Sequence, residues 1–378
     1  MQINSDLIGV IPAAGLGTRM GGSLPKALLS VHGRPLLDHA IAALEQLAVS
    51  KIVVVVGHAA DPVHEYLRTR DFGIEIAFAC QEQRLGLPHA IAMARDILTT
   101  EFVVLCPDNI FSDLEDLQYA KQAFLSRRPP FLMVATVTPT HQRDRARYSS
   151  GAMRSLGPHL YEYAVVDGGQ PQGLAMNSTG CTFFSRDSLK GLPSFTNVSA
   201  EVTLHTYLTQ LATTGQPLIY LLRGMRYDFS TPADVHAYDA LQDQLAQANA
   251  AGVSAILLNQ AGEILLQHRD DNPAIRYPGH WALFGGTVES GESAHAAARR
   301  EILEETSYNV ENLGLFREFV HNGKRESAFG GEINASLDEL SLSEGQGMDF
   351  VRPADLPKLL IRPDDRETLK AYFGVWDE

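Results

Sequence analysis

The chain has 378 residues, of which 45% are hydrophobic and 20% are charged, and its formal net charge is −14. This length allows about two to three domains with sizeable cores. The acidic balance argues against an extended basic surface, so we expect neither nucleic acid nor an anionic membrane as a partner.

Targeting segments and cysteine sites are not indicated either. The N-terminus lacks a basic segment followed by a long apolar one, and no run reaches about 18 apolar residues, which predicts a cytoplasmic protein without a membrane span. The three cysteines are far apart and lack C-x-x-C spacing, so neither a disulfide framework nor a zinc site is indicated. The oligomeric state stays open, with a homo-oligomer among the alternatives.

Strands and helices alternate through the first half of the chain. Helical spacing of apolar residues predicts helices from Pro35 and over 89–98. Apolar runs that end at turn residues predict strands at 7–13, 51–57, 74–81 and 101–109. This alternation is typical of a parallel, doubly wound sheet. Three more strands are expected around a polar segment at 140–175, and they lie at 131–139, 178–184 and 217–222.

The pattern changes near residue 250. A long helix is expected at 232–251, and after Gly252 two strands flank a Gln-Ala-Gly-Glu turn. A strand end at "WALFGG", a helix at 292–306 and a last helix in "RPDDRETLKAYF" follow. We therefore predict one domain over 1–248 and another over 252–378, with a short joint because no Pro/Gly/Ser-rich linker separates them.

A glycine-rich turn follows the first predicted strand. Gly15, Gly17 and Gly21 allow backbone N–H groups to approach an anion near a helix N-terminus. The turn lacks the G-K-[ST] of a Walker A loop, and the second strand ends in Gly57 rather than the acidic residue of a dinucleotide fold. Arg19 and Lys26 add two cations, which suits a triphosphate and the charge that develops on a leaving pyrophosphate.

These residues resemble a known signature. "GVIPAAGLGTRMGGSLPKALL" resembles the G-x-G-[ST]-R-x…P-K motif of nucleotidyltransferases that join NTPs to sugar 1-phosphates, and more matches follow in order over residues 7–245. The resemblance implies a GT-A-like Rossmann-type α/β domain that uses Mg²⁺. It implies catalytic roles for Arg19 and Lys26 and metal ligation by Asp108 and Asp228. It also implies nucleotide binding by Ala14, Gly15, Gly17, Thr18, Gln81, Gly86 and Gly180.

Physical arguments agree with part of this set. Asp108 and Asp228 each follow a predicted strand, where open α/β sheets bind their ligands, and two carboxylates there can hold Mg²⁺. Taken singly, an Asp at a strand end is more often a turn or cap residue. The Gln81 amide can donate and accept together, which favours a pyrimidine base.

The sequence departs from the hexose 1-phosphate enzymes at several positions. The spacer between Arg19 and Pro25 is shorter and resembles that of cytidylyltransferases acting on alcohol phosphates. The E-K-P segment expected before the sugar-contacting strand is missing, and Ser230 replaces the usual glycine. The acceptor is therefore a sugar 1-phosphate or an alcohol or polyol phosphate, and in either case a phosphorylated small molecule.

A second motif lies in the C-terminal third. "GGTVESGESAHAAARREILEET" resembles the Nudix box, G-x5-E-x7-R-E-U-x-E-E-x-G-U, at Gly286, Glu292, Arg300, Glu301, Ile302, Glu304 and Glu305, with Ser307 in place of the last glycine. On a helix Glu301, Glu304 and Glu305 face one side, where their mutual repulsion calls for Mg²⁺ or Mn²⁺.

The resemblance implies an α/β/α Nudix sandwich in which Glu301 and Glu304 are catalytic and all three glutamates bind metal. A solvated acidic helix face is the alternative for such a charge run taken alone. We expect a bifunctional, Mg²⁺-dependent enzyme that makes nucleotide phosphoanhydrides at one site and hydrolyses a nucleoside diphosphate derivative at the other. A non-catalytic Nudix-like domain that regulates the transferase is the other hypothesis.

Overall fold

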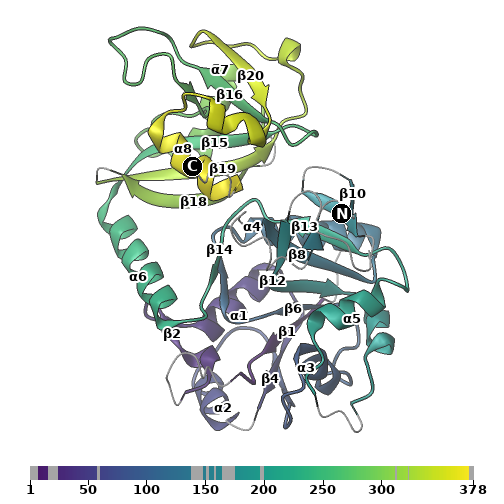
Figure 1. Cartoon of the computed structure of the whole chain (residues 1–378). Helices are drawn as coiled ribbons and strands as arrows, with labels where there is room; N and C mark the ends of the chain where they lie inside the picture. Colours follow the sequence, from purple (N-terminus) through teal and green to yellow (C-terminus); the bar gives the residue numbers. More distant parts are fainter. Residues whose placement is uncertain are drawn as a thin grey trace.

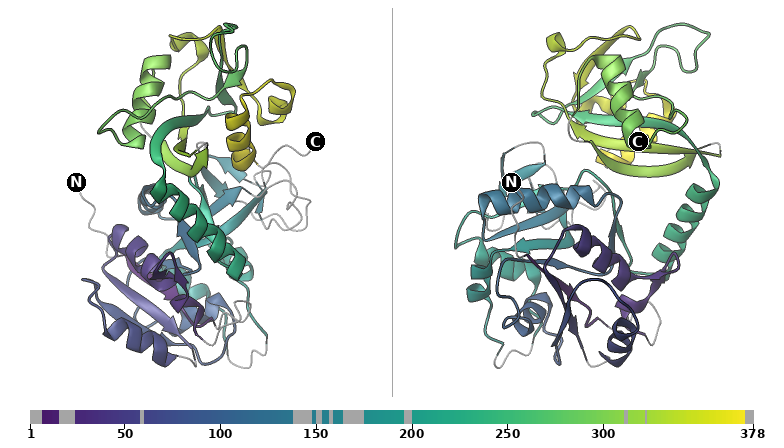
Figure 2. Two further views of the ribbon diagram at one scale, coloured as in Figure 1. Left: turned by 90° about the vertical axis from the view of Figure 1, so that its left-hand side faces the viewer. Right: turned by 180° about the vertical axis from the view of Figure 1, so that it is seen from behind.

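The computed structural model describes residues 7–15, 24–57, 60–137, 148–149, 153–156, 159–163, 175–195, 200–310, 313–321 and 323–373. The chain forms two parts, each built around its own sheet, and helix α6 (Pro232–Gln247) runs along one side of the molecule from the first part to the second (Figures 1 and 2). We call these the first and second parts.

The first half of the larger sheet is parallel, as the alternating pattern predicts. Its strands lie in the order β5-β4-β1-β6, and each pairs in parallel with its neighbour. The strands are β1 (Ile8–Pro12), β4 (Lys51–Val56), β5 (Ile76–Cys80) and β6 (Phe102–Leu105). The helices between them are α1 (Leu36–Gln46), α2 (Ala60–Arg68) and α3 (Leu87–Met93).

The second half of this sheet is mixed, in contrast to the parallel first half. Strand β12 (Ala175–Phe184) lies between β6 and β8 (Phe131–Val137) and runs antiparallel to both. The remaining strands are β9 (Tyr148–Ser149), β10 (Met153–Ser155), β11 (Leu160–Tyr163) and β13 (Leu218–Leu221). Helices α4 (Glu115–Arg127) and α5 (Leu204–Leu211) cover this half.

Both faces of the larger sheet are buried. On β4, Ile52 and Val54 pack with Leu44 of α1, whereas Val53 and Val55 pack on the opposite face with Ile91 of α3. Burying each such side chain contributes roughly 1.5–3 kcal/mol, which explains why the strand is a continuous β-branched run.

Small elements lie at the carboxyl edge of this sheet. Strand β7 (Asn109–Phe111) pairs with β14 (Arg226–Asp228), so segments more than 100 residues apart lie side by side. Strands β2 (Ser30–Val31) and β3 (Arg34–Pro35) form a short hairpin. Within the described ranges, the 3₁₀ helices are Lys26–Leu28, Arg186–Gly191, Leu337–Glu339 and Pro353–Lys358.

Helix α6 begins in a capping box and ends earlier than expected. Thr231 and Asp234 exchange hydrogen bonds at its first turn. The helix stops at Gln247 rather than continuing to residue 251, because Asn249 and Ala250 pair with Lys324 and Arg325 in the second sheet. The sheet ladder overrides the helix propensity of the alanines there.

The second part is a sheet between two helices, as the sandwich prediction requires. Helix α7 (Ala294–Thr306) packs on the face with Leu257 and Leu265, and α8 (Pro363–Phe373) packs on the face with Ile256 and Leu266. The strands are β15 (Asn249–Leu258), β16 (Ile264–His268), β17 (Trp281–Ala282), β18 (Leu313–His321), β19 (Lys324–Glu332) and β20 (Gly347–Val351). Their order is β17-β16-β15-β19-β18, and β20 pairs with β16.

Strand β18 docks the second part onto the first. The Met225 backbone N–H donates to the Phe316 carbonyl at 3.1 Å, and the Ser112 hydroxyl donates to the Leu315 carbonyl at 2.9 Å. The Leu315 N–H donates to the Asp113 carboxylate at 3.1 Å. These bonds fix β18 against the loop that leads into β14.

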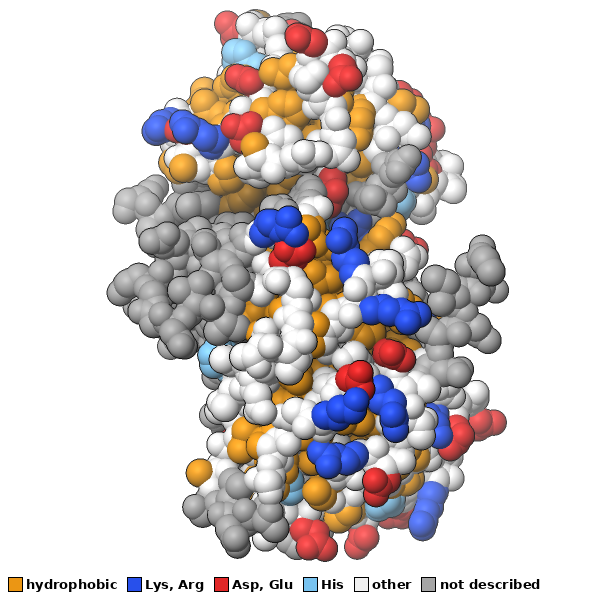
Figure 3. Space-filling view, turned by 90° about the vertical axis from the view of Figure 1, so that its right-hand side faces the viewer, with side chains coloured by type: hydrophobic (Ala, Val, Ile, Leu, Met, Phe, Trp, Pro, Cys, Tyr) orange, Lys and Arg blue, Asp and Glu red, His pale blue; other side chains and the backbone are white. Residues whose placement is uncertain are grey.

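Surface chemistry agrees with the acidic composition. On the face shown in Figure 3, Lys and Arg side chains are interspersed with Asp and Glu rather than forming a continuous basic stripe. Within the described ranges, no helix is both long and apolar enough to span a bilayer.

Candidate active sites

The glycine turn begins where β1 ends. Ala13, Ala14 and Gly15 follow the strand, and the Lys26 backbone N–H donates to the Gly15 carbonyl at 3.3 Å. This bond brings Gly15, where the turn begins, next to Lys26. Four residues predicted in this turn, Gly17, Thr18, Arg19 and Gly21, lie outside the described residues.

Lys26, Asp108 and Asp228 converge at the carboxyl edge of the sheet. Lys26 Nζ lies 2.6 Å from Asp108 Oδ2. The Phe229 N–H donates to the Asp108 carbonyl at 3.0 Å, and Asp228 is paired with Asn109 in the β7–β14 ladder. Three segments far apart in the sequence therefore supply one cation and two carboxylates to the same place.

Each carboxylate is oriented by neighbouring donors. Asn109 Nδ2 donates to Asp108 Oδ1 at 2.7 Å. Ser230 Oγ donates to Asp228 Oδ1 at 2.9 Å, and Arg226 Nη1 lies 3.2 Å from Asp228 Oδ2. The hydroxyl of Ser230 thus has a local partner at a position where the family motif has glycine.

The Cys106 thiol lies close to these charged side chains. Burial, and after it the nearby Asp108 carboxylate, raises the pKa of Cys106 to about 12, so this thiol is no nucleophile at neutral pH. Among the described residues, no group of three His, Cys, Asp or Glu side chains is arranged to hold a metal ion by itself. Two carboxylates do fit Mg²⁺ when phosphate oxygens of a substrate complete its coordination.

A cavity of about 370 Å³ lies beside these residues. Its lining includes Ala14, Gly15, Lys26, Gln81, Gly86 and Asp108, together with Arg84 and Glu201. Six of the predicted residues thus surround one space, which is the size of a small-ligand pocket.

Gln81 sits deep in this cavity with its amide nitrogen engaged. Gln81 Nε2 donates to the Gly86 carbonyl at 3.0 Å and lies 3.2 Å from His89 Nδ1. Gly86 has φ +92°, and a Cβ there would collide with the Val202 carbonyl, so only glycine fits. The Gln81 carbonyl oxygen is the part of the amide that remains to accept from a ligand.

Gly180 lies against Asn109, the neighbour of Asp108. Its φ is +76°, and an added Cβ would lie 2.8 Å from Asn109 Nδ2 and 3.0 Å from Cys106 Cβ. The Cys106 N–H donates to the Gly180 carbonyl at 2.9 Å. Gly180 therefore allows β12 to approach the Asp108 turn closely.

The glutamate helix α7 faces a second glycine turn. The Thr287 N–H donates to Glu301 Oε1 and the Gly285 N–H to Glu305 Oε2, both at 3.1 Å. A Cβ on Gly286 would collide with the Glu301 carboxylate. The Nudix-box glycine thus permits close contact between turn and helix.

Glu305 is a partly buried carboxyl group whose pKa is raised. Burial, and after it the charges of Glu301 and Glu344, raise its pKa to about 7, against the opposing effect of the Gly285 N–H. Such crowding of carboxyl groups suits a divalent cation between Glu301 and Glu305.

Arg300 forms ion pairs with three glutamates, one of which is the exposed Glu304. Arg300 binds Glu292 at 3.0 Å and Glu301 at 2.9 Å, and it contacts Glu304 at 3.3 Å, as the i,i+4 spacing predicts. The Glu304 side chain is 60% exposed, so it is the most accessible of the three glutamates.

A cavity of about 490 Å³ opens beside this turn. Its lining includes Gly285, Gly286, Thr287, Phe319, Glu326 and three cationic residues, Arg276, Lys324 and Arg362. These cations could not be found from the Nudix box, because they come from loops and strands far from it in sequence.

Asn109 and Arg226 are the missed residues of the first site. Arg226 Nη1 donates to Asn109 Oδ1 at 2.7 Å, and this bond links β14 to β7. Arg226 precedes Asp228 by two residues on a strand, so both side chains lie on one face. That spacing is the signal by which Arg226 could have been predicted.

Two known protein families match the chain. Residues 9–263 match the MobA-like NTP transferase domain family, and the chain belongs to this family. Residues 248–372 match the NUDIX domain. Both are enzyme families, so the chain combines a nucleotidyltransferase with a Nudix hydrolase domain, and the predicted fold class is confirmed.

Individual relatives cover parts of the chain. "Bifunctional protein GlmU" of Pseudomonas paraeruginosa is 36% identical over 151 residues, which are 40% of this chain and 32% of that protein. The protein of the same name from Bacillus cytotoxicus is 36% identical over 147 residues, 38% of this chain and 30% of that protein. The matches thus span about a third of these relatives.

Solved structures share the fold of the first part. UDP-glucose pyrophosphorylase complexed with UDP-glucose has a TM-score of 0.53 and 18% identity, covering 62% of this chain and 97% of that chain. A UTP-bound UGPase from Acinetobacter baumannii has a TM-score of 0.52 and 18% identity, covering 64% and 94%. At this identity the likeness shows the fold.

Proposed function

We propose that the chain transfers a nucleotidyl group from an NTP to the phosphate of a small molecule and releases pyrophosphate. The convergence of Lys26, Asp108 and Asp228 beside the Gln81 cavity carries this proposal. A cation and two carboxylates at one end of a nucleotide-sized space suit phosphoryl chemistry that depends on positioning and charge.

The reaction follows from these positions. An oxygen of the acceptor phosphate attacks the α-phosphorus in line and forms a new P–O bond. The bond from the α-phosphorus to the bridging oxygen breaks, and pyrophosphate leaves with the electron pair. Lys26 stabilises the charge that develops on this leaving group, and backbone N–H groups at Ala14 and Gly15 hold phosphate oxygens. Mg²⁺ on Asp108 and Asp228 would neutralise phosphate charge.

The base is a pyrimidine in this proposal. Since Gln81 Nε2 is engaged by Gly86 and His89, its carbonyl oxygen accepts from the base. The N3–H of uracil or thymine and the exocyclic amine of cytosine are suitable donors. The UTP and UDP-glucose held by the two similar structures support the same preference.

For the second part we propose Mg²⁺- or Mn²⁺-dependent hydrolysis of a nucleoside diphosphate derivative in the cytoplasm. Glu301 and Glu305 contact the glycine turn, and Glu304 is accessible. The lining of the adjoining cavity has three cationic and three acidic residues, namely Arg276, Lys324, Arg362, Glu326, Asp364 and Asp365. Because Arg362 is paired with Asp365 at 2.7 Å, Arg276 and Lys324 are the cations left to contact phosphates. A divalent cation held there would activate water. We place the division between the two activities at residues 248–252.

Two alternatives remain as second candidates. The short spacer before Pro25 favours an alcohol or polyol phosphate as acceptor, with CTP as donor. The bonds from β18 to Ser112 and Met225 favour a regulatory role of the second part, because they reach the loop that leads to Asp228.

A donor-by-acceptor screen tests the proposal. Pyrophosphate release is measured with five NTPs against glucose 1-phosphate, inositol 1-phosphate, glycerol 3-phosphate and phosphocholine. We expect one pyrimidine NTP to be preferred, and Lys26→Ala and Asp108→Ala each to lower the rate by about 100-fold or more. Near-normal release by both variants would overturn the site assignment.

A further inference from the structure

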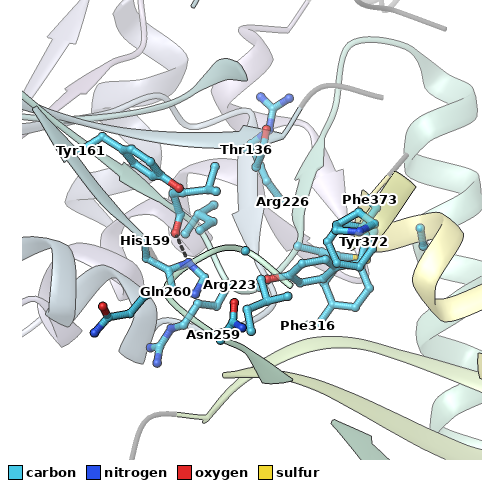
Figure 4. Close-up of a pocket in the computed structure, with 18 of the residues that line it drawn as sticks. Thr136, His159, Tyr161, Arg223, Arg226, Asn259, Gln260, Phe316, Tyr372 and Phe373 are labelled. Carbon is cyan, nitrogen blue, oxygen red and sulfur yellow. Dashed lines mark hydrogen bonds between the residues drawn. The ribbon is translucent and has the colours of Figure 1, made fainter. Parts of the chain in front are cut away.

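A cavity of about 630 Å³ lies where the two parts of the chain meet (Figure 4). It is distinct from the nucleotide cavity and from the cavity beside α7. The first part contributes Thr136, His159, Tyr161 and residues 221–226 to its lining. The second part contributes residues 258–262, Phe316, Pro353 and residues 371–373.

The position of this cavity is that of a substrate site. Strands β8 and β13 run parallel, and their carboxyl ends, Thr136 and Leu221, line it. Open α/β sheets bind ligands at this edge. The cavity therefore lies along the same edge of the sheet as Asp108, on the side away from the glycine turn.

Arg226 joins the cavity to the proposed transfer centre. It lines the cavity, and its Nη1 atom lies 2.7 Å from Asn109 Oδ1 and 3.2 Å from Asp228 Oδ2. In Figure 4, Arg226 and Thr136 lie at one end and Phe316 at the other. One end of the cavity is therefore a single side chain away from a proposed metal ligand.

The far wall belongs to the second part and is held in place. Phe316 and Tyr372 pack edge to face with ring centroids 4.9 Å apart. The Phe316 carbonyl accepts from the Met225 N–H at 3.1 Å. Because this wall is hydrogen-bonded to the first part, it has a defined distance from Arg226.

The lining has two chemical characters. Leu221, Leu222, Met225, Phe316 and Phe373 present apolar and aromatic surface. Two arginines also line the cavity: Arg223 is paired with Asp116 at 2.8 Å, and Arg226 lies at the end nearest Asp228. A volume of about 630 Å³ is typical of sites for ligands larger than one small polar group.

We infer that this cavity holds the acceptor of the transfer reaction, and that the acceptor is a phosphate monoester with an apolar body. Its phosphate lies near Arg226, beside the metal-binding carboxylates, and its body lies against Phe316 and Tyr372. The second part of the chain thereby completes the substrate site of the first. This inference rests on the proposed transferase function and names its substrate class.

A filling variant tests the inference. Ala261 is exposed, lines the cavity, and donates its N–H to Asn259 Oδ1 at 3.0 Å. Ala274 is an exposed alanine that donates to Asn272 Oδ1 at 3.0 Å in the same kind of turn, but it is not among the lining residues. Ala261→Trp should fill the cavity, and Ala274→Trp is the matched control.

Binding of 1-naphthyl phosphate and of inorganic phosphate is measured by calorimetry on the full chain. Wild type and Ala274→Trp should bind 1-naphthyl phosphate more tightly than inorganic phosphate, and Ala261→Trp should bind it at least about 10-fold more weakly. In the transfer assay Ala261→Trp should raise the acceptor KM by a similar factor with the NTP KM unchanged.

The outcomes separate the inference from the function on which it rests. Transfer with the same acceptor KM in Ala261→Trp and wild type overturns the inference alone. Equal affinity of wild type and Ala261→Trp for 1-naphthyl phosphate, or no binding, does the same. Binding that Ala261→Trp abolishes, without transfer from any NTP, overturns the proposed function and with it the role of acceptor.

Discussion

Asp116 holds the loop that contains Met225, which contacts β18, and that leads to Asp228. It is fully buried and accepts four hydrogen bonds: from Tyr220 Oη at 2.7 Å, Arg223 N at 2.7 Å, Arg223 Nε at 2.8 Å and Gly224 N at 3.1 Å. Asp116→Ala would leave the Arg223 guanidinium, which is 2% exposed, without its charge partner. We expect a loss of about 3–5 kcal/mol in the free energy of unfolding, as for other broken buried pairs.

Urea unfolding followed by circular dichroism measures this loss in the full chain. The matched control is Asp187→Ala, which removes the ion pair with Lys190, whose side chains are 79% and 80% exposed. We expect the midpoint of this control to equal that of wild type, because exposed pairs contribute little. A loss below about 1 kcal/mol for Asp116→Ala would refute the reasoning that its carboxylate organises the loop.

Three more predictions follow from single positions. Gly180→Ala should lower the free energy of unfolding by about 1–3 kcal/mol and slow transfer, because its Cβ would press on Asn109. A urea midpoint and a rate of pyrophosphate release equal to those of wild type would contradict this. Burial lowers the pKa of His159 to about 4, so the unfolded chain binds the extra proton first as the pH falls below its ordinary value of 6.5. The free energy of unfolding of the wild-type chain should fall by up to roughly 3 kcal/mol between pH 6.5 and pH 4, and that of His159→Asn should fall by less. The same pH dependence of stability in wild type and His159→Asn would disprove this. Gln81 should make UTP, dTTP or CTP better donors than ATP and GTP, and a purine preference in the screen would be inconsistent with it.

Local patterns sufficed to predict much of the fold. The β-branched run at β4, the glycine turn after β1 and the i, i+3, i+4 spacing on α7 each depend on neighbours in sequence, so their chemistry is readable from it. The sequence places Asp108 and Asp228 each after a predicted strand, but their proximity comes from the pairing of β7 with β14 in a separate two-stranded sheet.

Long-range pairing could not be predicted in the same way. The antiparallel entry of β12, the Asp116–Arg223 pair and the contacts of β18 with Met225 join segments many residues apart. Nothing in the local composition of either partner marks them. The cavity between the two parts arises from such contacts.

The central claim is that one chain carries two separate phosphoanhydride sites. Asp108→Asn and Glu301→Gln each remove one charge and keep the side-chain shape, and Asp108 lies in the first part of the chain whereas Glu301 lies on α7 of the second. The decisive measurement is a pair of rates on each purified variant, transfer and Mg²⁺-dependent hydrolysis of a nucleoside diphosphate sugar, with products separated by chromatography.

We expect Asp108→Asn to lose transfer by about 100-fold or more and to keep hydrolysis, and Glu301→Gln to lose hydrolysis by a similar factor while transfer stays within about threefold. Loss of both activities in either variant, or absence of hydrolysis in wild type, would contradict two independent sites and favour a regulatory second part.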